Sequence, residues 1–221
     1  MCKPLFRAVL FALALPALLT PRQSLAQSAD TADGLTAGSF LLRGRVVGVL
    51  PKHGGATIKP IGGYFDSSNS VTPEIDLSYF FTDHLAIEGE TGIVHSTLTA
   101  VDTRIGTVPI GKVSSVPIIL MGQYHFRPRA RLNPYLGIGI AITPYYGEEA
   151  AGGRIQQLSV SSEVGAAFQI GVDYRVHGPW YGNFDVKKLL LSAQACANDG
   201  KLTASGQINP WIIGAGIGYR F

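Results

Sequence analysis

The sequence predicts an all-β fold: a single eight-stranded antiparallel transmembrane β-barrel with short periplasmic turns and longer extracellular loops. Three observations predict it: the alternation of the closing segment, an even number of such segments, and aromatic residues beside nearly every short turn. From Trp211 to Phe221 every second residue is apolar, and the positions between them hold chiefly glycine. Such a strand has two unlike faces, and in lipid its edges find hydrogen-bonding partners only within a closed barrel.

The start of the chain has the pattern of a secretory signal peptide. Lys3 and Arg7 precede an apolar run from Ala8 to Leu19, and Ser24-Leu25-Ala26 supplies small residues at the positions that a signal peptidase recognises. The run is too short to be a membrane-spanning helix. The expected division of the chain is a signal peptide over 1–26, a flexible periplasmic leader over 27–38 and the barrel over 39–221.

Eight segments alternate in hydropathy, and the connections between them alternate in length. The expected strands are 39–50, 73–82, 85–96, 114–126, 134–145, 160–175, 180–192 and 207–221. The short connections are 82–84, 127–133 and 177–179, and the long ones are 51–72, 97–113, 146–159 and 193–206. Outer-membrane barrels have this rhythm, with short turns in the periplasm, and an even count returns the last strand to the first.

The segment 160–175 is the clearest of the internal strands. One face carries residues such as Val164, Phe168, Ile170 and Tyr174, while the other carries small and polar residues. Aromatic residues flank the short turns, as expected for a girdle at the membrane boundary. They are Tyr79 with Phe81, Tyr124 with Phe126, Tyr135, Tyr174, Trp180 with Tyr181, and Tyr219 with Phe221.

A soluble antiparallel β-sandwich would also show alternation. The signal peptide, the aromatic closing strand and the girdle favour the barrel over that alternative. After removal of the signal peptide, which takes Lys3, Arg7 and Arg22 from the 18 basic residues, 15 basic residues face 15 acidic ones. This balance gives no reason to expect nucleic acid as a partner.

Several sequence blocks, taken in order, resemble those of the OmpW-like outer-membrane proteins. The blocks are Arg43-Gly-Arg45, Tyr79 to Glu88, Gln123 to Phe126, Asn133 to Gly139, Gly171 to Tyr174, Asn183 to Lys188 and Asn209 to Phe221. The resemblance implies an eight-stranded barrel with an unusually apolar interior that passes small hydrophobic molecules. It also implies that Phe221 is the terminal aromatic residue recognised by the barrel assembly machinery during biogenesis.

Alternation places a group of charged residues inside the barrel, in the part nearer the short periplasmic turns. This charged base is Arg43, Arg45, Glu88, Glu90, Asp173, Arg175, Asp185, Lys187 and Arg220. Because an isolated buried ion is costly, these charges are expected to pair. They form either a structural plug of ion pairs or a path for protons or ions, and the sequence leaves both open.

Above the charged base the inward positions become small and apolar. The expected apolar lumen is Val47, Val49, Ile119, Met121, Ala141, Gly165, Ile212 and Gly214. Either bulky neighbours fill the space that the small residues leave, or it forms a pocket open to the outside. A pocket of this kind would favour an oily solute over a hydrated ion, which would lose its water there.

Four prolines, Pro73, Pro117, Pro144 and Pro210, fall near the outer ends of strands. Proline donates no ladder hydrogen bond, so the wall can be weaker there, although proline is also ordinary at strand ends. We therefore predict that solutes enter from outside and leave sideways through the wall. The substitution Pro117→Ala, which restores an N–H donor, tests this route.

The predicted function is a narrow outer-membrane channel for passive uptake of small hydrophobic molecules. The alternative is a non-conducting barrel whose loops bind an external partner, and a lipid-modifying enzyme is a weaker third. The adjacent His95 and Ser96 point to opposite faces of a strand and cannot form a catalytic dyad. None of the five histidines has the spacing of a metal ligand. The expected partners are outer-membrane lipids and lipopolysaccharide, a hydrophobic solute and the assembly machinery, with no cofactor or metal.

Overall fold

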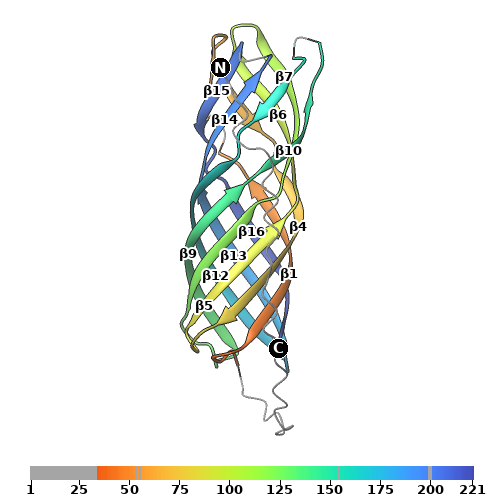
Figure 1. Cartoon of the computed structure of the whole chain (residues 1–221). Coiled ribbons are helices and arrows are strands. Elements are labelled where there is room, and N and C mark those ends of the chain that lie inside the picture. Colours follow the sequence, from red (N-terminus) through yellow and green to blue (C-terminus); the bar gives the residue numbers. More distant parts are fainter. Residues whose placement is uncertain (1–33, 53, 55, 154, 199–200) are drawn as a thin grey trace, which may run out of the picture.

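The computed structural model describes residues 34–221 except 53, 55, 154, 199 and 200, and the signal peptide lies outside these residues. Eight strands form a closed antiparallel barrel, which confirms the predicted fold class (Figure 1). Around the ring they are β1 (Phe40–Leu50), β16 (Trp211–Arg220), β13 (Trp180–Leu190), β12 (Glu163–His177), β9 (Leu132–Thr143), β8 (Ile118–His125), β5 (Leu85–Gly92) and β4 (Ser70–Phe80). Among the described residues no helix is long and apolar enough to cross a membrane.

The outer connections contain a second sheet where the sequence suggested loops. Its strands, in sheet order, are β10 (Tyr145–Ala150), β7 (Gly106–Ser115), β6 (Val94–Thr103), β3 (Tyr64–Ser67), β2 (Ala56–Lys59), β15 (Leu202–Gln207), β14 (Ser192–Ala197) and β11 (Leu158–Val160). The connections are rich in glycine, serine and threonine, but neighbouring hairpins pair with one another and so satisfy their backbone groups. In Figure 1 these strands prolong the barrel at the end opposite the C-terminus.

Short breaks separate the barrel strands from the outer strands that continue them. The breaks lie at 68–69, 93, 116–117, 144, 161–162, 191 and 208–210. Pro117, Pro144 and Pro210 occupy three of them, while Pro73 lies within β4 and pairs with Val46 of β1. Because proline has no N–H group, a ladder cannot run unbroken through these positions. Pro117, Pro144 and Pro210 therefore coincide with the change from the barrel to the outer sheet, whereas Pro73 does not.

The outward faces of the barrel strands form the lipid-facing surface. In β12, Val164 is 70% exposed and Ile170 is 59% exposed, as the alternation predicted. Among the exposed large apolar side chains of the described residues, only Tyr146 lies in a strand of the outer sheet, and Ile105 lies in the turn between β6 and β7. The lipid-facing belt therefore ends near the breaks, and the outer sheet extends beyond the membrane.

Most of the predicted girdle lies at the periplasmic end of the barrel. Tyr219 is in edge contact with both Trp180 and Phe221, at centroid distances of 5.0 and 4.9 Å. Tyr135 and Tyr181, however, point into the barrel, where they are 0% and 2% exposed. Their assignment to the girdle was wrong because each occupies an inward position of its strand.

The lower end of the barrel is closed by an apolar layer made of Leu35, Leu41, Phe80, Ala86 and Tyr181. Leu35 comes from the end of the segment that the sequence suggested was a flexible leader. Its side chain is fully buried, and its N–H donates to the Pro128 carbonyl at 2.8 Å. Residues 34–38 are thus docked against the barrel, because an apolar side chain gains by leaving water.

Candidate functional site

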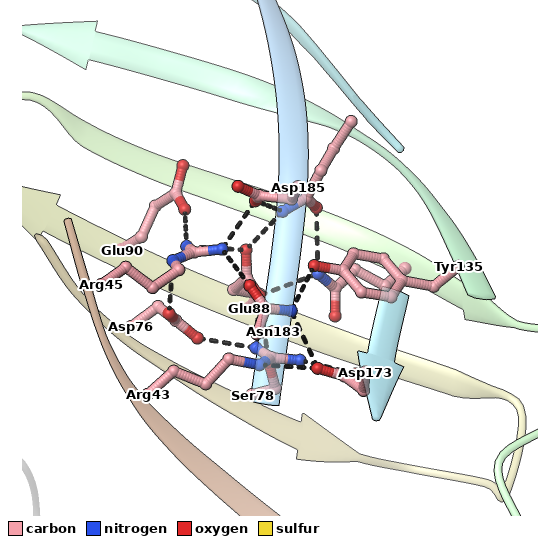
Figure 2. Close-up of polar contacts among 12 residues, drawn as sticks. Arg43, Arg45, Asp76, Ser78, Glu88, Glu90, Tyr135, Asp173, Asn183 and Asp185 are labelled. Carbon is pink, nitrogen blue, oxygen red and sulfur yellow. Dashed lines mark hydrogen bonds and ion pairs between the residues drawn. The ribbon is translucent and has the colours of Figure 1, made fainter. Parts of the chain in front are cut away.

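The centre of the barrel holds a network of buried ion pairs, which we call the ion plug (Figure 2). Its lower cation is Arg43 of β1, which is fully buried. Arg43 Nη1 lies 2.7 Å from both Asp76 Oδ1 and Glu88 Oε2. The rest of its guanidinium faces Asp173, with Nη2 to Oδ2 at 3.1 Å and Nε to Oδ1 at 3.2 Å. Arg43 therefore joins β1, β4, β5 and β12 across the lumen.

Arg45 lies two residues after Arg43, on the same inward face of β1, and binds a second set of carboxylates (Figure 2). Its Nη1 lies 2.6 Å from Asp185 Oδ2, and its Nη2 lies 2.6 Å from Glu90 Oε2 and 2.8 Å from Glu74 Oε1. Lys187 Nζ shares all three partners, with Glu90 at 2.5 Å, Glu74 at 3.0 Å and Asp185 at 3.4 Å. The upper half of the ion plug thus spans the lumen as well.

Amides connect the two halves of the ion plug. Gln169 Nε2 donates to Glu88 Oε1 at 3.1 Å and to Asp185 Oδ2 at 2.8 Å. Gln123 Nε2 donates to Glu88 Oε2 at 2.8 Å. The network is therefore continuous. Among the described residues, Glu90 Oε1 and Asp185 Oδ1 have no hydrogen-bonding partner, and Arg45 Nε faces Asp76 Oδ2 as an ion pair at 3.0 Å.

The structure brings together all of the predicted charged base except two residues. Arg175 and Arg220 are half-buried at the periplasmic end, where Arg220 Nη1 donates to the Gly34 carbonyl. Sequence reasoning missed several members of the plug. They are Glu74, Asp76, Ser78, Gln123, Tyr135, Gln169 and Asn183. The alternation of β4 was the available signal for Glu74, Asp76 and Ser78, because Ile75 and Leu77 between them are apolar.

The lumen above the ion plug is filled by a packed apolar layer. It consists of Val47, Ile119, Met121, Ala141, Ala167, Leu189, Leu191 and Ile212. Five of the predicted lumen residues belong to this layer, namely Val47, Ile119, Met121, Ala141 and Ile212. Gly214 lies at its lower border against Asp185 and Val47. Gly165 lies where a Cβ would overlap the Leu190 carbonyl, so close strand approach requires glycine there. Much of the space that small residues leave is thus occupied.

An apolar pocket lies above this layer, where the barrel meets the outer sheet. It contains about 990 Å³ of empty space, part of it open to solvent. The predicted lumen residues Val49 and Ile212 line it, together with Leu189 and Leu191 from the top of the packed layer. Pro117 and Pro210, at two of the breaks in the wall, also line it. The pocket therefore begins where the packed interior ends.

No group of three or more histidine, cysteine or acidic side chains suited to a metal ion occurs among the described residues. Within them, His95 Nδ1 and Ser114 Oγ are 2.8 Å apart on an exposed surface of the outer sheet. Among the residues that the structure describes, no third side chain is hydrogen-bonded to this pair in the manner of a catalytic triad.

Comparison with known proteins agrees with the barrel. Residues 36–221 match the model of the OmpW family. The chain is 39% identical over 198 residues to the uncharacterized outer-membrane protein y4mB of Sinorhizobium fredii, a match that covers 87% of this chain and 85% of that protein. It is 30% identical over 199 residues to outer membrane protein W of Escherichia coli, with 84% and 89% covered.

Two solved structures share the fold. The outer membrane protein OprG from Pseudomonas aeruginosa superimposes with a TM-score of 0.79 at 20% identity, covering 86% of this chain and 98% of that one. The outer membrane protein AlkL in DMPC lipid bilayers gives a TM-score of 0.63 at 21% identity, covering 85% and 92%. The family match and the closed barrel together show that the chain belongs to the OmpW family and is a protein of the bacterial outer membrane.

Proposed function

We propose that the protein is a narrow channel for passive uptake of small hydrophobic molecules. The observation that carries this proposal is the apolar pocket, which is partly open to solvent and lies above a lumen closed by packed side chains and ion pairs. A hydrophobic molecule gains roughly 25 cal/mol for each Å² of apolar surface that it removes from water. A hydrated ion would lose its water in the same pocket without finding a compensating partner.

The closed lower lumen favours a sideways exit. Directly beneath the pocket, Leu189 and Ile212 belong to the packed layer, and the ion plug lies below it. A solute moving along the axis would have to displace this layer and break buried ion pairs, which is costly. Motion through the wall would instead require a local separation of strands.

The wall beside the pocket offers two kinds of site for such a separation: breaks at prolines, and the seam between the edge strands of the outer sheet. Pro117 and Pro210 line the pocket at breaks between barrel and outer strands. β10 and β11 are the two edge strands of the outer sheet. Tyr145 of β10 and Val160 of β11 also line the pocket. Between them, the Val160 N–H donates to Glu148 Oε1 at 2.6 Å. A seam held by side chains opens at less cost than a continuous ladder.

Filling the pocket tests the proposal. Leu189 of β13 is 2% exposed and lines the pocket, whereas its neighbour Leu190 is 46% exposed on the lipid face. In reconstituted liposomes we expect Leu189→Trp to abolish entry of the apolar fluorophore phenylnaphthylamine, while Leu190→Trp leaves it unchanged. The unmodified protein should show apolar flux with weak ion conductance. If it shows neither, the uptake proposal is contradicted and the result favours the alternative, a non-conducting barrel whose loops bind an external partner.

A further inference from the structure

The outer pocket has two walls of different chemistry. In the closed barrel, β16 lies diametrically opposite β8, with three strands between them on either side. The wall formed by β1, β13, β16 and their continuations is chiefly apolar and includes Val49, Leu189, Ile208 and Ile212, together with Lys52 after β1. The facing wall, formed by β6, β7, β9 and β10, carries hydroxyl groups. They belong to Ser96, Ser115, Thr143 and Tyr145, which we call the hydroxyl wall.

The hydroxyl wall is assembled from neighbouring strands. Ser115 of β7 pairs with Tyr145 of β10, and Val94, two residues before Ser96, pairs with the same serine. The Val116 N–H donates to the Pro144 carbonyl at 3.2 Å, which holds the residue after Ser115 beside the residue after Thr143. The hydroxyl groups therefore lie on neighbouring strands of one wall, with Val94 and Val113 between them.

Two of these residues are buried, and their hydroxyl groups are not used by the described part of the protein. Thr143 is 6% exposed, and its buried Oγ1 has no hydrogen-bonding partner among the residues that the structure describes. Ser115 is 7% exposed, and its side chain makes no hydrogen bond to that part of the chain either. A buried hydroxyl without a partner costs on the order of 1–3 kcal/mol. These groups are thus available to a molecule in the pocket, Ser115 directly and Thr143 after rotation about its Cα–Cβ bond.

We infer that the preferred cargo is a hydrophobic molecule with one uncharged hydrogen-bonding group at one end, such as an alcohol, phenol, ketone or ester. Its hydrocarbon body packs on the wall of Val49, Leu189 and Ile212, and its polar end bonds to the hydroxyl wall. Hydroxyl groups both donate and accept, so the wall serves carbonyl and hydroxyl oxygens alike. This inference rests on the proposed uptake function and adds the class of substrate to it.

The hydroxyl wall carries no formal charge. Burial raises the pKa of the Tyr145 phenol well above its ordinary value, and the nearby Glu163 carboxylate acts in the same direction, so the phenol stays protonated at physiological pH. Lys52 and Asp66, which also line the pocket, belong to other segments, after β1 and in β3. An anionic head group at the hydroxyl wall would lose its water without meeting an opposite charge, and it would face the Glu163 carboxylate, which is the strand partner of Thr143. The wall therefore selects against an anionic end.

A pair of probes that differ by one oxygen tests the inference. We would titrate para-fluorotoluene and para-fluorobenzyl alcohol into lipid nanodiscs that hold the protein, with empty nanodiscs as the baseline, and follow binding by fluorine NMR. The double variant Ser115→Ala/Thr143→Val preserves shape and removes the two unused hydroxyl groups. It should weaken binding of the alcohol roughly three- to ten-fold and leave binding of the toluene unchanged.

Two controls separate failure of this inference from failure of the uptake function. Ser159→Ala removes an exposed hydroxyl of β11 that does not line the pocket, and it should change neither probe. Leu189→Trp should abolish binding of both probes if the pocket is the binding site. If Leu189→Trp acts on both but the double variant changes neither, or changes both equally, the inference fails while the uptake function stands. If Leu189→Trp changes neither, the pocket is not the site and both proposals fail.

Discussion

Arg43 and Asp173 lie 130 residues apart in the sequence and face each other across the barrel, forming a paired contact of guanidinium and carboxylate. β1 and β12 are not neighbours in the ring, since β16 and β13 separate them. The contact therefore crosses the lumen and braces opposite parts of the wall. Such two-pronged contacts fix direction as well as distance.

Removing Arg43 should strongly destabilise the barrel. Arg43→Met leaves the carboxylates of Asp76, Glu88 and Asp173 buried without this partner, and we expect a loss of about 3–5 kcal/mol in the free energy of unfolding. Urea titration in lipid vesicles measures it. Arg127→Met, at an exposed position in a periplasmic turn, is the matched control and should change little. A loss for Arg43→Met no larger than that of the control would contradict the bracing role.

The ion plug contains more acidic than basic side chains, so neutralising one acid should cost less than removing a base. Among the described residues, the basic partners of Glu74, Asp76, Glu88, Glu90, Asp173 and Asp185 in the ion plug are Arg43, Arg45 and Lys187. Glu90 Oε1 has no hydrogen-bonding partner in the described part of the chain, whereas Arg45 binds several carboxylates. We expect Glu90→Gln to change the unfolding free energy by less than about 1.5 kcal/mol and Arg45→Met to cost about 3–5 kcal/mol. If the two variants lose the same unfolding free energy in the urea assay, the prediction that the ion plug has an excess of negative charge is contradicted.

Pro117 tests the sideways route. Pro117→Ala supplies an N–H group at a break beside the pocket, which would strengthen the wall. We therefore expect slower entry of phenylnaphthylamine, by several-fold, with unchanged binding to the pocket. Pro179→Ala, in a turn at the opposite end of the barrel, should have no effect on entry. Unchanged entry in Pro117→Ala would exclude this part of the wall as the exit.

Deletion of Phe221 should impair assembly rather than selectivity. Phe221 is 67% exposed beyond β16 and contributes little to the interior. Its N–H donates to the Phe40 carbonyl at 2.9 Å at the closing seam of the barrel. We expect several-fold less folded protein in the outer membrane, measured by heat-dependent gel mobility. The fraction that does insert should take up phenylnaphthylamine at the normal rate for each molecule.

Docking of residues 34–38 should depend on pH through Asp83. The pKa of the Asp83 carboxyl is lowered chiefly by a hydrogen bond from the Ala37 N–H and, second, by one from Arg129. Because the folded pKa lies below the unfolded one, the stabilisation is fully present above the ordinary aspartate pKa of about 3.9 and is lost as the pH falls through the folded value. The amide shift of Ala37 should follow this titration, and Asp83→Asn should remove it. A shift that persists in the variant would assign the titration to another group.

The periodicity of the sequence accounted for the barrel and for much of its interior. Alternation placed Arg43, Arg45 and Asp185 inside because a strand in lipid cannot turn charges outward at its centre. The same rule would have found Glu74 and Asp76 in β4. It failed for Tyr135 and Tyr181, where an aromatic residue beside a short turn was taken for a girdle residue although its position faces inward.

The sequence by itself determined the closed eight-stranded barrel, the inward faces of its strands and the division of the lumen into charged and apolar parts. Only the tertiary structure decided that residues 34–38 dock, that the outer connections form a sheet, and that Ser115 and Thr143 lie opposite Val49 and Ile212 around one pocket. The physical reason is that alternation is a local property of each strand. Pairing between hairpins, and the distance across a closed ring, depend on residues far apart in the chain.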